Sequence, residues 1–173
     1  MAITAEYLGM TLRLSDLDVE NLEYFSHCAA HKFHLQRCEE CHLLRYPPTT
    51  ACPWCASPKA AWVAVEDKGA VHSYTEVHHA IQPQFKAFTP YLVLLVDLDT
   101  QKGKPTEHEA LRVVGNLVTP DGKLAPPDQV RRVGIGTRVR MAFTDVAEGL
   151  SLPQWMIDAE ATQPAAPWRY PVE

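Results

Sequence analysis

Four cysteines carry the clearest chemistry in this sequence. They form two C-x-x-C pairs, Cys38 with Cys41 and Cys52 with Cys55, and ten residues separate the pairs. Each pair can present two thiolates to one ion from a single tight turn, and four thiolates complete the closed tetrahedral shell of a structural zinc site. The spacing therefore predicts a zinc ribbon whose metal stabilises the fold. Iron in a rubredoxin-like centre uses the same ligands and stays open as an alternative.

Thiol–disulfide exchange is the competing chemistry for a C-x-x-C pair. It favours a pair at the start of a helix, where the helix dipole lowers a thiol pKa. The second pair here reads C-P-W-C and leads into a Ser-Pro turn, so metal binding is the better interpretation. Gly often follows the second Cys of such a turn, but His42 and Ala56 stand there. Because Ala tolerates a positive φ less well than His, we expect the second turn to be slightly irregular.

The composition is that of a globular protein without a strongly basic surface. The chain has 173 residues, a formal net charge of −5 and 46% apolar residues. The acidic balance weighs against a nucleic-acid partner, which favours a concentrated basic surface. We expect no signal peptide and no membrane span, because no basic-then-apolar leader and no apolar run of about 20 residues occur. With four of five cysteines in metal spacing, we expect a reducing, cytoplasmic location and a buried Cys28.

A helix is predicted to begin near residues 15–18 and to lead into the first cysteine pair. Ser15 or Asp16 can cap it, and acidic residues follow in its first turn. The predicted apolar face consists of Leu22, Phe25, Ala29 and Phe33. The opposite face consists of Glu20, Glu23, His27, His31 and His34. The three histidines could bind a second metal or dock on a partner, but a solvated face is the preferred interpretation. Residues 1–14 show no firm pattern.

After the ribbon the hydrophobic period changes to two, which is typical of strands. We expect strands near residues 61–66, 70–79, 91–98, 111–118, 137–146 and 154–159. Residues 91–98 are nearly all apolar, as in a central buried strand, and in 70–79 we expect Val71 and Tyr74 on opposite faces. Short strands without long helices between them predict a small antiparallel barrel of five or six strands.

The chain therefore divides into four predicted parts. They are an N-terminal arm and helix (1–36), a zinc ribbon (37–60), a barrel (61–160) and a Pro-rich tail (161–173). Pro-rich segments stay extended, and the isolated Trp168 and Tyr170 in this tail suggest docking on a partner.

The order of the motifs resembles a known family. L-Q-R-C-E-E-C, R-Y-P-P and C-P-W-C precede G-A-V-H-S-Y-T-E-V, T-P-Y-L-V-L-L-V-D-L-D, V-V-G-N-L-V and V-G-I-G-T-R-V-R-M-A-F. Over about residues 18–160 the chain resembles the bacterial and archaeal proteins that join a rubredoxin-like zinc ribbon to an OB-fold, known as domain-of-unknown-function family thirty-five. The four ribbon cysteines match the metal ligands of that family. The loop at residues 99–110 looks longer than its usual tight turn.

The resemblance implies a mainly β protein with an OB-fold barrel and an accessory role. Members of that family associate with acyl-CoA and sit beside thiolase-like enzymes, including acyltransferases and the aldolases that shorten steroid side chains. The thiolase-like partner holds the catalytic residues in such heteromeric complexes, for which we expect a heterotetramer. The preferred prediction is thus a non-catalytic subunit.

The sequence itself supports a non-catalytic role mainly by omission. It contains no G-x-S-x-G elbow, no phosphate-binding Gly loop and no H-E-x-x-H. Asp97 and Asp99 could pair for acid–base chemistry, although a strand end facing water is the commoner interpretation. Of the adjacent His78 and His79, at most one can face any pocket, because neighbouring strand residues point to opposite faces.

Two other functions stay open. A stand-alone acyl-CoA-binding or delivery module would use Arg45, Phe85, Lys86 and Phe88, the best available set for the phosphates and the apolar chain of CoA. A partner-binding apolar loop explains Phe85 and Phe88 equally well.

A single-stranded nucleic-acid module would need aromatic residues interleaved with basic ones on the barrel strands. Tyr74 is instead flanked by His72 and Glu76, and Arg138 and Arg140 form only a small basic patch. We therefore expect no nucleic-acid partner.

Overall fold

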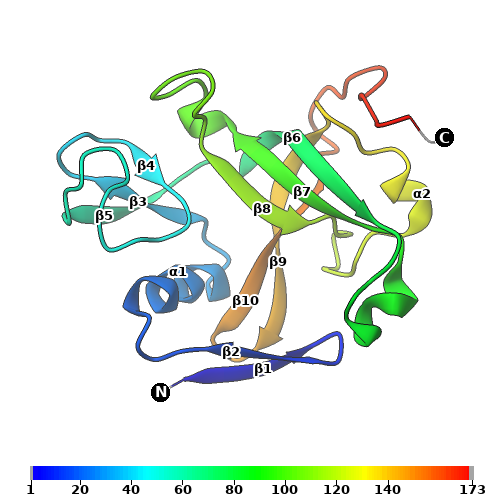
Figure 1. Ribbon diagram of the computed structural model, residues 1–173, viewed down its shortest axis with the longest axis horizontal. Helices are drawn as coiled ribbons and strands as arrows, with labels where there is room; N and C mark the ends of the chain where they lie inside the picture. Colours follow the sequence, from blue (N-terminus) through cyan, green and yellow to red (C-terminus); the bar gives the residue numbers. More distant parts are fainter. Residues whose placement is uncertain (1, 172–173) are drawn as a thin grey trace.

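Five strands form the largest sheet of the computed structural model, which describes residues 2–171. They are β6 (Lys68–Val77), β7 (Tyr91–Leu98), β8 (Arg112–Asn116), β9 (Arg138–Ala147) and β10 (Leu150–Ile157). Their spatial order is β10-β9-β6-β7-β8, with every pair antiparallel (Figure 1). A parallel bridge from Leu117 to Trp155 returns the end of β8 to β10, so the sheet curls towards closure. The predicted mainly β class and OB-type barrel are confirmed.

The barrel core is built around β7. Leu92, Leu94, Val96 and Leu98 are fully buried and alternate with half-buried residues along the strand. Because β7 pairs with β6 on one side and β8 on the other, the predicted central strand is confirmed. The fully buried Trp155 of β10 lies against β8, where an added Cβ at Gly115 would come within 2.9 Å of the indole. Only glycine permits this approach.

A β-bulge changes the alternation of β6. The register with β7 shifts between Val71 and Ser73, which makes His72 the extra residue. Val71 and Tyr74 are therefore both buried, and the prediction that they lie on opposite faces is wrong. The bulge exposes His72, whose Nδ1 lies 3.0 Å from an oxygen of Asp97.

A smaller three-stranded sheet carries the ribbon. It contains β3 (His34–Cys38), β4 (Leu44–Arg45) and β5 (Ala60–Ala64) in the order β4-β3-β5. β5 was expected to belong to the barrel, but it pairs with β3 from Cys38↔Ala60 to His34↔Ala64. The four-part division of the chain stays a prediction, with residues 60–64 placed on the ribbon sheet by this pairing.

One buried glutamine joins the ribbon to the barrel. Gln101 lies in η2 (Asp99–Gln101), in the loop that follows β7. Its side-chain oxygen accepts a hydrogen bond from the Leu44 N–H at 2.7 Å, and its amide donates to the Leu44 carbonyl at 3.2 Å. The two sheets are therefore fixed to each other by a pair of buried hydrogen bonds.

The helix α1 (Val19–Ala29) begins one residue beyond the predicted start. The Asp18 carboxylate caps it by accepting from the Asn21 N–H at 3.1 Å. Its fully buried side chains are Tyr24 and Cys28, one turn apart, so the expected burial of Cys28 is confirmed. The predicted apolar face is confirmed in part, because Phe25 packs against the core and Phe33 is buried, but the prediction left out Tyr24 and Cys28. The helix ends early because the chain turns at His31, which has a φ of 52°. His31 and His34 therefore do not share a helical face with His27.

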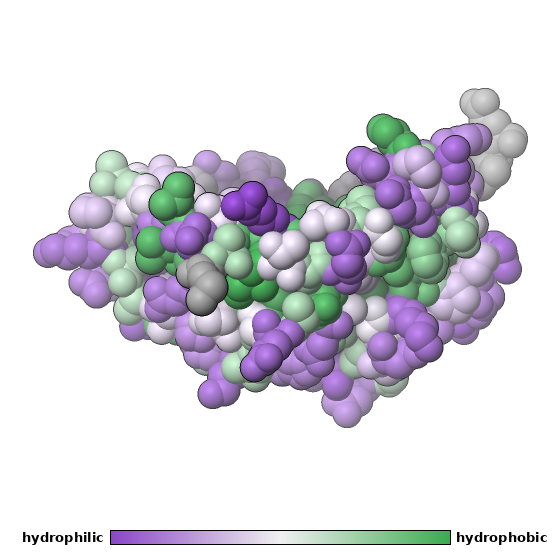
Figure 2. All heavy atoms as spheres, turned by 90° about the horizontal axis from the view of Figure 1, so that it is seen from below, coloured by the Kyte–Doolittle hydropathy of each residue, from purple (hydrophilic) through white to green (hydrophobic). Residues whose placement is uncertain are grey.

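Residues 3–14 form a β-hairpin, although their sequence shows no firm pattern. β1 (Ile3–Tyr7) and β2 (Met10–Leu14) pair through a turn at Leu8 and Gly9, both with positive φ. The hairpin crosses the ends of β9 and β10 (Figure 1). Figure 2 shows apolar side chains among polar ones across the middle of this face. Leu17, between the hairpin and the helix, is 90% exposed, and Val19, the first residue of α1, is 64% exposed.

Two short helical segments lie in the loops between the barrel strands. They are η1 (Pro83–Phe88) and α2 (Pro127–Val130). The tail packs on the barrel, since Ile135 and Trp168 exchange two backbone hydrogen bonds of 2.8 and 3.2 Å. Arg169 donates to the carbonyls of Val130 and Val133 and pairs with Glu76. Among the helices that the structure describes, none has the length and apolarity that a membrane crossing requires.

Candidate metal centre

The four ribbon cysteines meet at one point. Their Sγ atoms all lie within 4.8 Å of one another, and the structure places Cys38 3.5 Å from Cys55 and Cys41 3.6 Å from Cys52. Tetrahedral coordination with metal–sulfur bonds of about 2.3 Å separates sulfur atoms by about 3.8 Å. The set therefore fits one tetrahedral metal ion, bound by two residues from each turn.

Both metal turns have the same backbone geometry. The His42 N–H donates to the Cys38 carbonyl at 3.1 Å, and the Ala56 N–H donates to the Cys52 carbonyl at 2.8 Å. His42 and Ala56 have φ values of 61° and 60°, the conformation that the missing glycines usually adopt. The expected irregularity of the second turn is wrong, because Ala56 accepts the strained conformation and the turn closes normally.

Backbone N–H groups stabilise thiolates in these turns. The N–H of Cys41, followed by that of Glu40, lowers the pKa of the Cys38 thiol to about 6. At Cys52, burial raises the pKa, but hydrogen bonds from the N–H groups of Cys55 and Trp54 outweigh burial and the pKa is lowered. The other two ligands shift the opposite way: although the Leu43 N–H lowers it, burial and the hydrogen bond with Cys52 raise the pKa of Cys41 to about 12, and the pKa of Cys55 is raised as well. Because thiolates are the metal-binding form, a bound metal would have to displace the protons of Cys41 and Cys55.

The residues predicted to bind CoA do not form one site. Phe85, Lys86 and Phe88 lie on η1, whereas Arg45 lies on β4 at the opposite side of the molecule (Figure 1). Phe85 is buried and meets the Phe88 ring edge to face at 6.4 Å, while Phe88 is 38% exposed. Phe85, Lys86 and Phe88 thus stay together as a candidate set, and Arg45 is apart from them.

Arg45 has an unusual environment. It is 3% exposed, and its Nε donates to Gln36 Oε1 at 2.9 Å. Its Nη1 has no hydrogen-bond partner among residues 2–171. The sequence suggested Arg45 as an accessible cation for the CoA phosphates. Its burial could not be predicted locally, because it depends on the pairing of β4 with β3.

The two aromatic residues of the tail are held but exposed. The rings of Trp168 and Tyr170 meet edge to face at 4.6 Å, and the residues are 50% and 57% exposed. The Tyr170 N–H donates to the Tyr74 hydroxyl at 2.9 Å. The anchoring surface is therefore the chain's own barrel, and docking of the exposed rings on a partner stays a prediction.

The acidic candidates each have their own basic partner. Asp97 accepts from Arg112 Nε at 2.8 Å and faces His72, while Asp99 pairs with Arg138. The Arg138 guanidinium lowers the pKa of Asp99 through its hydrogen bonds. The two carboxylates are thus engaged separately. Arg138, part of the small basic patch noted in the sequence, is held in its ion pair with Asp99.

The three histidines grouped in the sequence analysis separate into one pair and one residue that bonds to the barrel. His31 Nε2 lies 2.7 Å from Asp145 Oδ1, and the Ser151 hydroxyl donates to the same oxygen at 2.5 Å. Because the serine bonds to the carboxylate and not to the imidazole, the geometry links the helix to the barrel and does not activate a nucleophile. The rings of His27 and His34 stack at 4.3 Å. The His31–Asp145 contact joins residues 114 apart and has no local signal in the sequence, whereas His27 and His34 belong to the group that the sequence suggested.

Comparisons with known proteins give the family. Residues 62–144 match the family model described as ChsH2, C-terminal OB-fold domain. The solved structure called Ltp2-ChsH2(DUF35) aldolase has a chain 30% identical to this one, with a TM-score of 0.63, and the similarity covers 83% of this chain and 98% of that one. A probable enoyl-CoA hydratase alpha subunit of Thermomonospora curvata is 32% identical over 134 residues.

The match to the hydratase subunit covers 78% of this chain but 36% of that protein, so the chain spans about a third of its length. The match to the aldolase chain is nearly complete in that chain and agrees with the barrel and the cysteine cluster described above. The chain belongs to the DUF35 family of OB-fold proteins.

Proposed function

We propose that this chain is a non-catalytic subunit of a heteromeric enzyme that acts on acyl-CoA thioesters. The observation that carries the proposal is the 30% identity to a chain of the Ltp2-ChsH2(DUF35) aldolase, a similarity that covers 98% of that chain. The second relative is named a subunit of an enoyl-CoA hydratase, which again suggests an assembly that handles acyl-CoA. A thiolase-like partner would hold the catalytic residues, and steroid side-chain CoA esters are candidate substrates.

The polar groups of this chain support an accessory role. Asp97, Asp99 and Asp145 each bond to a side chain of the same molecule, so these carboxylates act as structural links. The exposed apolar residues Leu17 and Val19 and the tail rings offer surface to a partner. An aldolase or acyltransferase partner would cleave or transfer the acyl unit with its own residues.

Co-purification tests the proposal. The chain would be expressed with the thiolase-like protein encoded nearest to it, the pair separated by size exclusion, and carbon–carbon cleavage and acyl transfer assayed with and without this chain. We expect a stable complex, as a heterotetramer, whose activity or solubility requires this chain. A monomer that leaves the activity and solubility of the enzyme unchanged would contradict the proposal.

We further propose that Cys38, Cys41, Cys52 and Cys55 hold zinc as a structural ion. Four sulfur ligands leave no open position for water, so a bound ion would supply a rigid cross-link between the two turns. We expect one zinc per chain by mass spectrometry of the purified protein. Iron would be recognised by its visible absorption. Cys52→Ser should lose the metal, whereas the matched variant Cys28→Ala, outside the cluster, should keep it.

A direct contact with acyl-CoA is a second candidate, favoured by the surroundings of η1. Phe85 of η1 lines a groove of ≈500 Å³ together with Tyr7 and Tyr91, and the exposed Lys86 and Phe88 lie on the same short helix outside the lining. An apolar groove with a cation on the adjoining helix suits an acyl chain followed by phosphates. Titration of acyl-CoA into the isolated chain should then saturate, and Lys86→Glu should weaken the binding. Equal affinity of wild type and variant would remove η1 from the proposal.

A further inference from the structure

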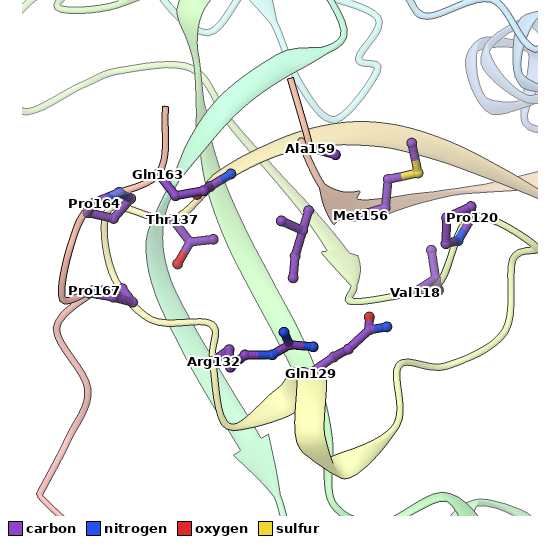
Figure 3. Close-up of a pocket in the computed structure, with 11 residues that line it drawn as sticks. Val118, Pro120, Gln129, Arg132, Thr137, Met156, Ala159, Gln163, Pro164 and Pro167 are labelled. Carbon is purple, nitrogen blue, oxygen red and sulfur yellow. The ribbon is translucent and has the colours of Figure 1, made fainter. Parts of the chain in front are cut away.

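A cavity of ≈390 Å³ lies between the tail, the α2 segment and β10 (Figure 3). It is on the side of the molecule opposite the ribbon (Figure 1), and the function proposed above does not use it. Its walls are mostly apolar and include Val118, Pro120, Met156, Ile157, Pro164 and Pro167. A cavity of this size, with apolar walls and few polar groups, is typical of a small-molecule site.

The polar groups available in the cavity lie at one end. Gln129 lies in α2 and Arg132 lies two residues after its end, and both point into the cavity from the same side (Figure 3). The Gln129 side chain has no hydrogen-bond partner in the described part of the chain. Arg132 bonds to Asp128 through Nε and Nη2 at 3.2 and 3.3 Å, an exposed contact that competes weakly with a ligand.

The other two polar groups of the cavity already have partners. The Thr137 hydroxyl accepts from the Gly134 N–H at 3.0 Å. The Gln163 amide accepts from the Arg138 N–H at 2.9 Å and donates to the Arg138 and Asp158 carbonyls at 3.0 and 2.8 Å. These groups hold the tail against the barrel and leave Gln129 and Arg132 as the pair that can meet a ligand.

We propose that this cavity binds a small amphipathic carboxylate. The hydrocarbon chain would lie against the apolar walls, and the carboxylate would accept hydrogen bonds from Arg132 and the Gln129 amide. An extended peptide is disfavoured, because Pro120, Pro164 and Pro167 have no N–H group to pair with a strand. The site shares no residue with the metal centre or with η1, so it goes beyond the accessory function.

The wall formed by the tail is fixed before any ligand binds. The N–H and the carbonyl of Trp168 both form hydrogen bonds with the backbone of Ile135. The Arg169 guanidinium donates to the carbonyls of Val130 and Val133 and pairs with Glu76. The Arg169 guanidinium also lies 5.2 Å from the centre of the Tyr74 ring. Because the wall is in place, a ligand loses little free energy in ordering it.

Calorimetric titration of the full-length chain with octanoate, octanol and acetate tests the proposal. Octanoate should saturate one site per chain, octanol should bind about tenfold or more weakly, and acetate should not bind measurably. Arg132→Gln, at an exposed position, should weaken octanoate binding about tenfold or more and leave octanol binding unchanged.

A filling variant gives the second arm of the test. Ala159 lines the cavity and is exposed, so Ala159→Trp should block octanoate and octanol alike. Ala165→Trp adds the same ring to an exposed tail position outside the cavity and should leave both affinities unchanged. No octanoate binding by the wild type, or equal octanoate affinity in the wild type, Arg132→Gln and Ala159→Trp, would overturn the proposal.

Discussion

The residue that closes the second metal turn holds an unfavourable backbone conformation. Ala56 has a φ of 60°, which places its Cβ close to the neighbouring backbone. Glycine has no Cβ and adopts this conformation without strain. Glycine also makes the unfolded chain more flexible, which offsets part of this gain. Ala56→Gly should therefore raise the free energy of unfolding of the metal-loaded protein by about 0.5–1 kcal/mol.

Urea unfolding with a fixed metal content measures this difference. The matched control is Ala61→Gly, at an exposed position of β5 with ordinary strand geometry, which should lower the stability by a similar amount. If Ala56→Gly lowers the free energy of unfolding as Ala61→Gly does, then backbone strain at Ala56 does not reduce the stability of the protein.

The stacked histidines predict a sensitivity to acid. Burial, and next the nearby His34, lower the pKa of His27, while Glu23 opposes this and Lys32 adds to it. A lowered pKa means that the unfolded chain binds the proton more readily than the folded one. Stability should therefore fall as the pH drops below about 6.5, the ordinary value for histidine.

Unfolding midpoints between pH 7.5 and pH 5 (about the range over which histidine titrates) test this sensitivity. His27→Gln should flatten the decline, whereas His78→Gln, at a 63% exposed side chain, should not change it. Release of the metal in acid affects both variants alike. An unchanged decline in His27→Gln would assign the acid sensitivity to other groups.

At the scale of elements, close backbone contact fastens the tail to the barrel. A Cβ at Gly134 would come within 2.3 Å of the Trp168 carbonyl oxygen, which is backbone and cannot turn aside. Gly134→Ala should therefore displace the tail and cost about 1–3 kcal/mol, as expected of overpacking. The displaced segment should become accessible to protease near residues 160–171.

Limited proteolysis and thermal unfolding measure the two effects together. Gly103→Ala is a useful control, because Gly103 has a φ of 70° but no atom near its added Cβ. It should cost about 1 kcal/mol through backbone strain and leave the tail resistant. Wild-type resistance of the tail in Gly134→Ala would show that it bends without detaching.

At the scale of the whole molecule, one buried cluster joins helix, ribbon and barrel. It contains Tyr24 and Cys28 of α1, Leu35 and Leu44 of the ribbon, and the inward residues of β7. Gln101 adds two buried hydrogen bonds between ribbon and barrel. Because these parts share a core, loss of the metal should weaken the barrel as well as the ribbon.

Chelation of the metal tests this coupling. The apparent binding free energy of structural zinc is about 10–16 kcal/mol, and about 2–4 °C of melting temperature corresponds to each kcal/mol in a chain of this size. We expect a fall of roughly 20 °C or more, with faster hydrogen exchange in both β3 and β7. Unchanged exchange in β7 after chelation would mean that the barrel folds independently.

The sequence by itself determined the features that depend on local pattern. The spacing of the four cysteines and the apolar run at residues 91–98 each specify a local structure, and both appear as expected. The motif order also identified the family, because it records the succession of elements along the chain. Such signals survive in the sequence since they involve residues that are close together in the chain.

Only the tertiary structure decided the pairings between distant segments. The bulge at His72 and the place of β5 on the ribbon sheet depend on which strand lies alongside, and the early end of α1 depends on a turn at a non-glycine residue. The link from His31 to Asp145 spans 114 residues, and the cavity beside the tail is formed by segments that meet only in the fold. Long-range packing selects these arrangements, and no local propensity encodes them.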